Sequence, residues 1–402
     1  MISDEQRELV AEKIEQMKKK NVIENHPYDI SKITRHGEEY YLTYVFDETK
    51  KNHRRQISAK SLENLENKIY DDYTKNTLLT FEKVSKMWLV HYRSGVKDTT
   101  FDRTMSDYNR FVPSCSFAQK SISKIKPIEI QEYLQNTIIK EKLRVHAYRN
   151  MKSIFNGIFK YAYNKEFITK NPMEGLEVST SNLERPSKKS KEEEVFTRKE
   201  TALIKDYIKA DVANYNNTVP YAILLSFQLG LRVGELIALK WSDISNGTIH
   251  IQRQEVIYNQ YDENLTKVAS SVHEIREYTK SQAGDRKLPL TPEALRILTD
   301  VESWNKENGI RSDYIFVDQN GKTFNRQRIN TYLYNYCVKV GIIKKSSHKI
   351  RRFVVSNLLD NIANGVCVQH FAGHEDLQTT LSAYYKDISD DEDLYIGMCS
   401  CL

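Results

Sequence analysis

The spacing of apolar residues changes character along the first part of the chain. Residues 1–20 follow a polar helical pattern, and residues 58–73 carry apolar side chains at helical intervals. Between these segments, apolar residues recur at every second position, on one face of an expected strand, at Tyr40, Leu42, Tyr44 and Phe46. We therefore expect residues 1–76 to form a small sheet, of about three strands, packed on a helix.

Residues 77–178 show helical periodicity throughout and are expected to form a separate helical bundle. Thr80 stands where the first helix needs a cap, and Asn171-Pro172 ends the last one. The expected helices lie at 81–92, from about Thr99, at 128–138 and at 145–167.

The rest of the chain reads as a linker followed by a third, mixed unit. Residues 179–195 are polar, charged and without periodicity, which predicts an interdomain linker. In residues 196–402 helical patterns dominate. One strand is expected to begin with residues 248–251, and another strand is expected to end with residues 288–290. The expected fold class is multidomain and mainly α: a β-sheet-plus-helix N-terminal domain, a helical domain, and a mixed α+β but mostly helical C-terminal domain.

Composition narrows the class of protein. Hydrophobic residues make up 40% and charged residues 28%, which is typical of a globular protein. The charged N-terminus lacks the apolar stretch of a secretory signal, and no apolar run approaches the length of a membrane helix, so we expect a cytoplasmic protein without membrane contact. Five scattered cysteines predict no disulfide framework, and Cys399-x-Cys401 is interpreted as two reduced thiols rather than a metal site.

The positive charge is concentrated in one segment. The whole chain carries +6, whereas residues 77–179 alone carry +7 and residues 1–76 carry −1. A localised basic face suits contact with phosphates, although an ordinary solvated surface would give the same excess.

Two arginine-containing motifs are candidates for anion binding. Arg232 lies between Gly230 and Gly234 at an expected helix start, with Glu235 placed to hold its guanidinium. His348 and Arg351, spaced i, i+3, share one helix face and could move a proton and grip two phosphate oxygens. Taken singly, the first motif is also consistent with a salt-bridged helix cap, and the second is common by chance.

A third motif carries a candidate nucleophile. Gly373-His374 is followed by paired threonines and then by Tyr384 and Tyr385. A tyrosine can attack a phosphorus and leave again, which makes a covalent step reversible. Any one of the 25 tyrosines could equally serve packing alone.

Together and in this order, the three motifs resemble the catalytic domain of the tyrosine recombinase (phage integrase) family, in particular the integrases of conjugative transposons. The resemblance assigns catalytic roles to Arg232, Lys280, His348, Arg351, His374 and Tyr384, with Glu235 as a supporting acid. Lys280 is expected on a β-hairpin, and Lys287 is its alternative. Because the tyrosine is doubled, Tyr385 stays a second candidate for the nucleophile.

The resemblance also covers the other regions. It implies that residues 1–76 form an arm-type DNA-binding domain, that residues 77–178 form a core-binding domain, and that residues 196–402 form the catalytic domain with a C-terminal tail. We expect two basic groups to contact DNA, namely Lys50, Lys51, Arg54 and Arg55 at a strand start, and Arg149, Lys152 and Lys160 on the exposed face of 145–167. A charged, solvated hairpin would explain the first group nearly as well.

The implied activity is site-specific recombination of a mobile element through a 3′-phosphotyrosine, without a metal or other cofactor. The implied partners are double-stranded DNA with core-type and arm-type sites, three further copies in a tetramer, and an accessory bending or directionality factor. The tail from Lys386 onward is expected either to dock on a neighbouring copy or to be a frayed end. A bacterial cytoplasm, with nucleoid association during activity, is the implied location.

Three rival interpretations stay open at this point. A DNA-binding regulator without catalysis would share the basic segment but would not need Tyr384. A type IB topoisomerase would use the same chemistry on any supercoiled plasmid. A resolvase of chromosome dimers would lack the extra N-terminal domain, which favours an integrase. The sequence leaves the target sites and the balance of integration and excision undetermined.

Overall fold

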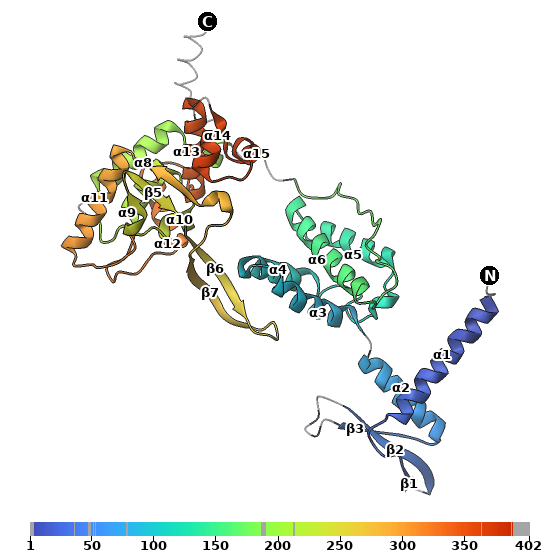
Figure 1. Cartoon of the computed structure of the whole chain (residues 1–402). Coiled ribbons are helices and arrows are strands. Elements are labelled where there is room, and N and C mark those ends of the chain that lie inside the picture. The colour runs from blue at the N-terminus through green and yellow to red at the C-terminus, as the bar shows by residue number, and fades with distance from the viewer. Residues whose placement is uncertain are drawn as a thin grey trace. The chain divides into compact units, whose positions relative to one another are not determined.

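The computed structural model describes residues 4–35, 37–46, 50, 52, 54–77, 79–185, 190–211, 214–362, 364–386 and 388. Within these residues the chain forms two compact units (Figure 1). One unit comprises residues of 1–92 and 106–184, and the other comprises residues of 93–105 and 185–402.

The N-terminal region is an antiparallel sheet packed on a helix, as its sequence pattern predicted. Helix α1 (Asp4–Glu24) precedes β1 (Ser31–Arg35), β2 (Glu38–Phe46) and β3 (Arg54–Ala59), and α2 (Leu62–Thr77) follows. The strands pair in the order β1-β2-β3. The core of this region contains Ala59, Leu65 and Ile69. On β2 the fully buried side chains are Thr43 and Val45, so the face with Tyr40 and Tyr44 is the less buried one.

The four helices expected after residue 77 are all present. They are α3 (Phe81–Ser94), α4 (Asp98–Phe111), α5 (Pro127–Lys140) and α6 (Val145–Asn164), with a 3₁₀ turn η1 (Ile122–Lys124). Thr80 accepts a hydrogen bond from the amide of Lys83 at 3.2 Å, which is the predicted cap. Phe81 packs against Phe117, Phe155 and Phe159, and these aromatic contacts hold the bundle around one core.

The C-terminal unit is built around one buried helix. Helix α9 (Val219–Leu229) is apolar on all sides because α8 (Arg198–Ala210), α11 (Pro292–Glu307), α12 (Arg326–Lys339) and α13 (Ser347–Asn361) pack on it. The side chain of Thr197 caps α8 by accepting from the amide of Glu200. The shorter helices are α7 (Lys191–Glu194), α10 (Val233–Ile237), α14 (Gly365–Ala372), α15 (Leu377–Thr379) and two 3₁₀ turns, η3 (Trp241–Asp243) and η4 (Gln282–Gly284). A π-helical turn, η5 (Thr380–Tyr384), completes the unit. Val195, the last residue of the predicted linker, is fully buried in this core.

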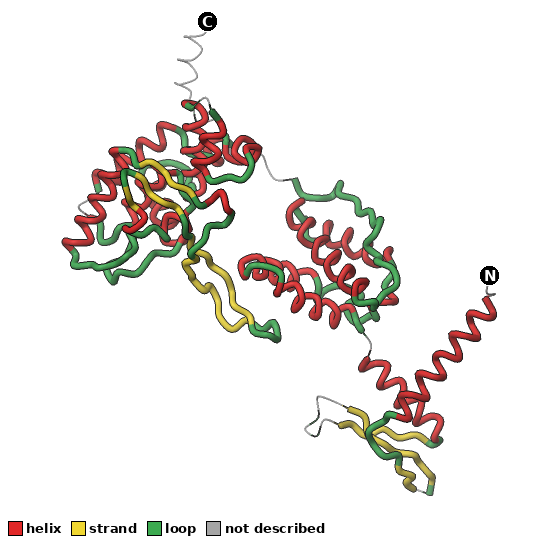
Figure 2. The backbone as a smooth tube through the Cα atoms, in the orientation of Figure 1, coloured by secondary structure: helices red, strands yellow, loops and turns green. Residues whose placement is uncertain are grey.

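Two small sheets lie in the same unit. Strands β4 (Ile244–Ser245), β5 (Thr248–Ile251) and β8 (Arg286–Pro289) form one antiparallel sheet in that order. Strands β6 (Gln254–Tyr261) and β7 (Lys267–Arg276) form a separate hairpin, which extends away from the helices of residues 196–402 (Figure 2). The chain from β5 to β8 therefore passes through this hairpin first. The expected fold class, mainly α with a small N-terminal sheet and a mixed C-terminal domain, is confirmed.

Candidate active site

Arg232 is held by a buried carboxylate. It is the residue before α10, and its Nη1 donates to Oε1 of Glu235 at 2.7 Å while its Nη2 donates to the carbonyl of Gly373 at 3.1 Å. The side chain of Glu235 is 1% exposed and that of Arg232 is 25% exposed. Burial opposes the charge of Glu235, but the guanidinium groups of Arg286 and Arg232 outweigh it and lower the pKa of this carboxyl. The carboxylate of Glu235 thus fixes the orientation of the Arg232 guanidinium, while part of the Arg232 side chain faces solvent.

Arg351 is the second guanidinium of the site and is almost completely buried. It lies on α13, donates to the carbonyls of Gly230 and Ala372, and donates to Nε2 of His374 at 2.8 Å. Among the described residues its Nε has no hydrogen-bond partner. Burial, followed by the nearby charge of Arg232, lowers the pKa of Arg351 to about 10, so it stays charged at neutral pH. Two cations meet here, which favours a bound anion.

His374 is a neutral hydrogen-bonding group. Because a guanidinium can only donate, Nε2 of His374 accepts from Arg351, and Nδ1 carries the proton that is donated to Oγ1 of Thr380 at 2.9 Å. Burial and the charge of Arg351 lower the pKa of His374 to about 3. The imidazole is therefore fixed in one tautomer and stays neutral over the physiological range.

The two neighbouring tyrosines lie in different surroundings. The ring centroid of Tyr384 is 4.3 Å from that of His374 and 5.3 Å from that of His348, and the guanidinium carbon of Arg351 lies 5.1 Å from the Tyr384 ring centroid. Tyr385 is 46% exposed, and its hydroxyl donates to Oδ1 of Asp360 at 3.1 Å. The structure thus brings Tyr384, and not Tyr385, to the arginine and the two histidines.

The backbone around Tyr384 is fixed by one buried serine. Oγ of Ser356 on α13 donates to the carbonyl of Tyr384 at 3.2 Å and accepts from the amide of Lys386 at 2.8 Å. The side chain of Ser356 is fully buried. Sequence reasoning did not identify this residue, because a serine within a helix carries no local sign of such a contact.

His348 is the second residue of α13, follows the buried Ser347 and is exposed. Partial burial of its ring, then the charges of Arg352 and Arg351, lower its pKa to about 4. It is consequently neutral at neutral pH and able to accept a proton. His348 and Arg351 both lie next to the ring of Tyr384, as expected for residues spaced i, i+3 on one helix face.

The predicted location of Lys280 on a β-hairpin is wrong. The hairpin β6–β7 ends at Arg276, and Lys280 lies beyond it, exposed, in the loop that leads to η4. The reason is that β6 begins at Gln254, which pairs with Arg276, so the residues after Arg276 have no partner in the hairpin. Lys287, the alternative, is exposed on β8 opposite His250.

Arg286 was missed as a site residue. Its side chain is 7% exposed and donates to Oε2 of Glu235 at 3.0 Å, so Glu235 is shared between two arginines. The sequence offered only a basic residue before a strand, which gives no sign of a buried contact with a carboxylate 51 positions earlier.

The predicted DNA-contact residues stay predictions. Arg149 and Lys160 are exposed on α6, and Lys152 is partly exposed there. Lys50 and Arg54 are exposed, Arg55 pairs with Asp72, and Lys51 lies outside the described residues. The tail predicted to dock on a neighbouring copy also lies outside them from residue 389 onward.

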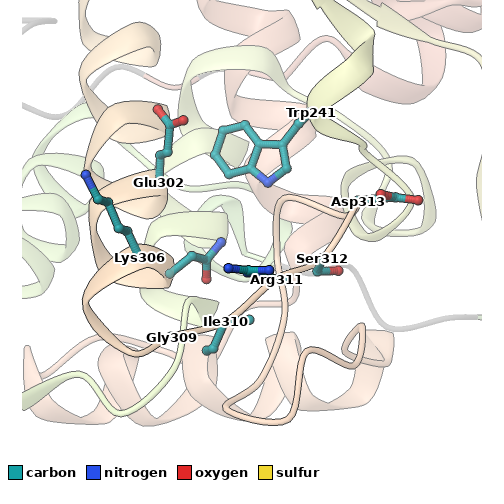
Figure 3. Close-up of a pocket in the computed structure, with 9 residues that line it drawn as sticks. Trp241, Glu302, Lys306, Gly309, Ile310, Arg311, Ser312 and Asp313 are labelled. Atoms are coloured by element: carbon teal, nitrogen blue, oxygen red, sulfur yellow. The ribbon is translucent and has the colours of Figure 1, made fainter.

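Other features of the described chain lie apart from this cluster. A surface pocket of about 930 Å³ is lined by Trp241, residues of the end of α11 including Glu302 and Lys306, and the loop Gly309–Asp313 (Figure 3). In the described part of the chain, no group of three or more metal-ligating side chains comes together. None of the described helices has both the length and the apolar character of a membrane span.

The cluster can bind a phosphate diester and react with it. Two guanidinium groups can supply charge and hydrogen bonds to non-bridging oxygens, His374 fixes one of them, Arg351, and the phenolic oxygen of Tyr384 can act as a nucleophile. Such an arrangement lowers the barrier to attack on phosphorus because the donors are already in place.

Comparison with known proteins identifies the family. The phage integrase family matches residues 194–390, and a phage integrase N-terminal SAM-like domain matches residues 80–139. A XerC-like tyrosine recombinase of Caldanaerobacter subterraneus is 24% identical over 375 residues, covering 87% of this chain and 93% of the relative. A probable integrase of prophage ps2 of Lactococcus lactis is 25% identical, covering 83% of this chain and 85% of the relative.

Solved structures share the fold. The integrase of transposon Tn1549 in complex with a circular intermediate DNA superposes with a TM-score of 0.59 at 20% identity, covering 81% of this chain and all of that one. A lambda integrase tetramer bound to a Holliday junction gives a TM-score of 0.53 at 15% identity, covering 90% and 96%. The family expected from the motifs is thereby confirmed: the chain belongs to the phage integrase family and is a tyrosine-type site-specific recombinase, a DNA strand transferase.

Proposed function

We propose that this recombinase acts as the integrase of a mobile element and that Tyr384 is its nucleophile. The phenolic oxygen of Tyr384 attacks a backbone phosphorus, a new P–O bond forms, and the bond to the 5′-oxygen breaks. The product is a 3′-phosphotyrosine and a free 5′-hydroxyl. Because the tyrosine ester retains the free energy of the broken bond, a 5′-hydroxyl from another strand can reverse the step without ATP.

Each neighbouring group has a chemical task in this scheme. Arg232 and Arg351 stabilise the negative charge that grows on the non-bridging oxygens, and Glu235 orients Arg232. His348 accepts the phenolic proton, and His374, whose Nε2 accepts from Arg351, holds that guanidinium in place for the phosphoryl oxygens. Lys280 protonates the leaving 5′-oxygen. All of these tasks are performed by protein side chains, so cleavage is expected to proceed in the presence of a chelator.

The observation that carries this proposal is the placement of the tyrosines. Tyr384 packs against His374 and His348 with Arg351 over its ring, whereas the hydroxyl of Tyr385 is committed to Asp360. We expect Tyr384→Phe to abolish covalent trapping on a nicked suicide DNA substrate and Tyr385→Phe to retain it. Trapping by Tyr384→Phe at the wild-type level would contradict the assignment.

The partners follow from the same proposal. Double-stranded DNA is bound at core-type sites by residues 77–178 together with residues 196–402, and at arm-type sites by residues 1–76, with 179–195 as the linker. Four copies join two DNA sites, an accessory factor sets the direction, and the reaction takes place at the bacterial nucleoid. Relaxation of plasmids that lack a specific site would instead indicate a topoisomerase-like activity.

A further inference from the structure

The loop that carries Lys280 is compact, although Lys280 itself is exposed. Thr279 is 7% exposed, and its Oγ1 donates to the carbonyl of Ser281 at 2.6 Å. The amide of Gly284 donates to the same carbonyl at 3.0 Å. A Cβ at Gly284 would lie 2.7 Å from Oγ1 of Thr279, so the two ends of the loop touch and only glycine fits. Lys280 therefore extends from a closed turn.

Arg286 links this turn to the rest of the site by hydrogen bonds. Its Nη1 donates to the carbonyl of Gly284 at 2.8 Å, its Nε donates to the carbonyl of Phe371 at 2.7 Å, and its Nη2 donates to Glu235 at 3.0 Å. One rigid, planar side chain thus joins the Lys280 loop, the segment before His374 and the carboxylate that holds Arg232.

The segment before His374 is shaped to receive this arginine. Gly373 has φ +63°, and a Cβ there would lie 2.9 Å from Nη1 of Arg286 and 2.9 Å from the carbonyl of Ala283. The close approach of Arg286 and the loop at this point therefore requires a residue without a side chain.

We propose that Arg286 is a positioning residue that holds the Lys280 loop in place so that Lys280 can protonate the leaving 5′-oxygen. This inference rests on the proposed role of Lys280. A lysine has a long flexible side chain, so its value as an acid depends on a backbone fixed close to the phosphate. Arg286 holds protein groups rather than a reacting atom, since its Nε, Nη1 and Nη2 each donate to a carbonyl or a carboxylate.

A change of the leaving group in the substrate distinguishes this role of Arg286 from an indirect effect of Arg286 on Arg232 through Glu235. In a substrate whose bridging 5′-oxygen is replaced by sulfur, Tyr384 attacks phosphorus and the P–S bond breaks. A thiol ionises near pH 8.5, as in cysteine, so the thiolate leaves without a proton. Loss of the acid then no longer matters, whereas loss of charge stabilisation by Arg232 still slows the attack on phosphorus.

The experiment compares single-turnover cleavage of the oxygen and sulfur substrates by the full-length protein. General acids contribute roughly 10²–10⁴-fold to such steps. We expect Arg286→Lys to slow cleavage of the oxygen substrate by about 10–100-fold and to cleave the sulfur substrate at nearly the wild-type rate. Thr279→Val, which removes the hydrogen bond within the loop, is expected to show the same selective defect in case Arg286→Lys does not fold.

Matched controls make the comparison specific. Arg296→Lys and Thr299→Val change the same residue types on α11 and should leave both rates unchanged, with DNA affinity and thermal stability measured for every variant. Equal slowing of both substrates by Arg286→Lys and Thr279→Val, or no slowing by either, would overturn the inference. If Lys280→Ala is also not rescued by sulfur, the proposed role of Lys280 fails; if only the Arg286 and Thr279 variants are not rescued, the positioning role alone fails.

Discussion

Replacing Glu235 by Gln tests the idea that one buried carboxylate organises the arginines. The carboxylate accepts from Nη1 of Arg232 at 2.7 Å, from the amide of Arg232 at 3.1 Å and from Nη2 of Arg286 at 3.0 Å. Glutamine keeps one acceptor oxygen but places an NH₂ group where a second acceptor stood. It also leaves the positive charges of Arg232, Arg286 and Arg351 without a counter-charge.

The size of the effect follows from burial. Removing one partner of a buried ion pair typically costs about 3–5 kcal/mol, because the remaining charge is left uncompensated. For a unit of this size, about 1 kcal/mol shifts Tm by roughly 2–4 °C, so Glu235→Gln should lower Tm by about 10 °C. Glu293→Gln is the matched control, since Glu293 pairs with Lys209 and Arg296 at the surface and should cost less than about 1 kcal/mol.

Scanning calorimetry of the full chain, which resolves separate transitions, measures the Tm of both variants.

The lowered pKa of Glu235 also predicts how this difference in Tm depends on pH. Its charge contributes stability above the ordinary glutamate pKa, and this contribution is lost as the pH falls through the lower folded-state value. The difference in Tm between wild type and Glu235→Gln should therefore shrink in acid, below about pH 4.3. Equal Tm values for Glu235→Gln and Glu293→Gln at neutral pH would refute the reasoning.

Three further changes have defined outcomes. Ser356→Ala removes both hydrogen bonds that fix the backbone around Tyr384, and it should slow covalent trapping roughly tenfold at unchanged DNA affinity. Trapping at the wild-type rate would count against this role of Ser356. Gly373→Ala should cost roughly 2 kcal/mol more in urea unfolding than Gly309→Ala, because both glycines have positive φ but only the first lacks space for a Cβ. The low pKa of His374 means that the folded state loses stability as the pH falls from about 6.5 towards 3, because the imidazole binds a proton more readily in the unfolded chain. His374→Gln should therefore lose this part of the acid sensitivity.

The sequence was most informative where contacts are local. The helices of the bundle follow from apolar spacing, and Thr80 and Thr197 cap helices because the hydrogen-bonded amides are only three residues away. The family could be named because its motifs are short and ordered. The placement of His348 and Arg351 on one helix face needed only the geometry of one helix.

The parts that were missed depend on contacts between distant segments. Arg286 meets Glu235 and Phe371 only after β8 has paired with β5. A hairpin was expected between these strands, but the sequence does not show that it ends at Arg276, and Lys280 was therefore placed on it. No local pattern reports which residues a strand will pair with when an insertion separates it from its neighbour.

Helix α13 combines two duties that have a practical consequence for rebuilding the enzyme. It carries Arg351, which we propose binds the phosphate, and five residues later Ser356 forms hydrogen bonds with the chain on either side of Tyr385. A chimaera that imported a foreign segment from Leu377 onward would have to present a carbonyl and an amide to this serine in the same register. Designers who exchange such segments should therefore transplant α13 along with them, as a single cassette.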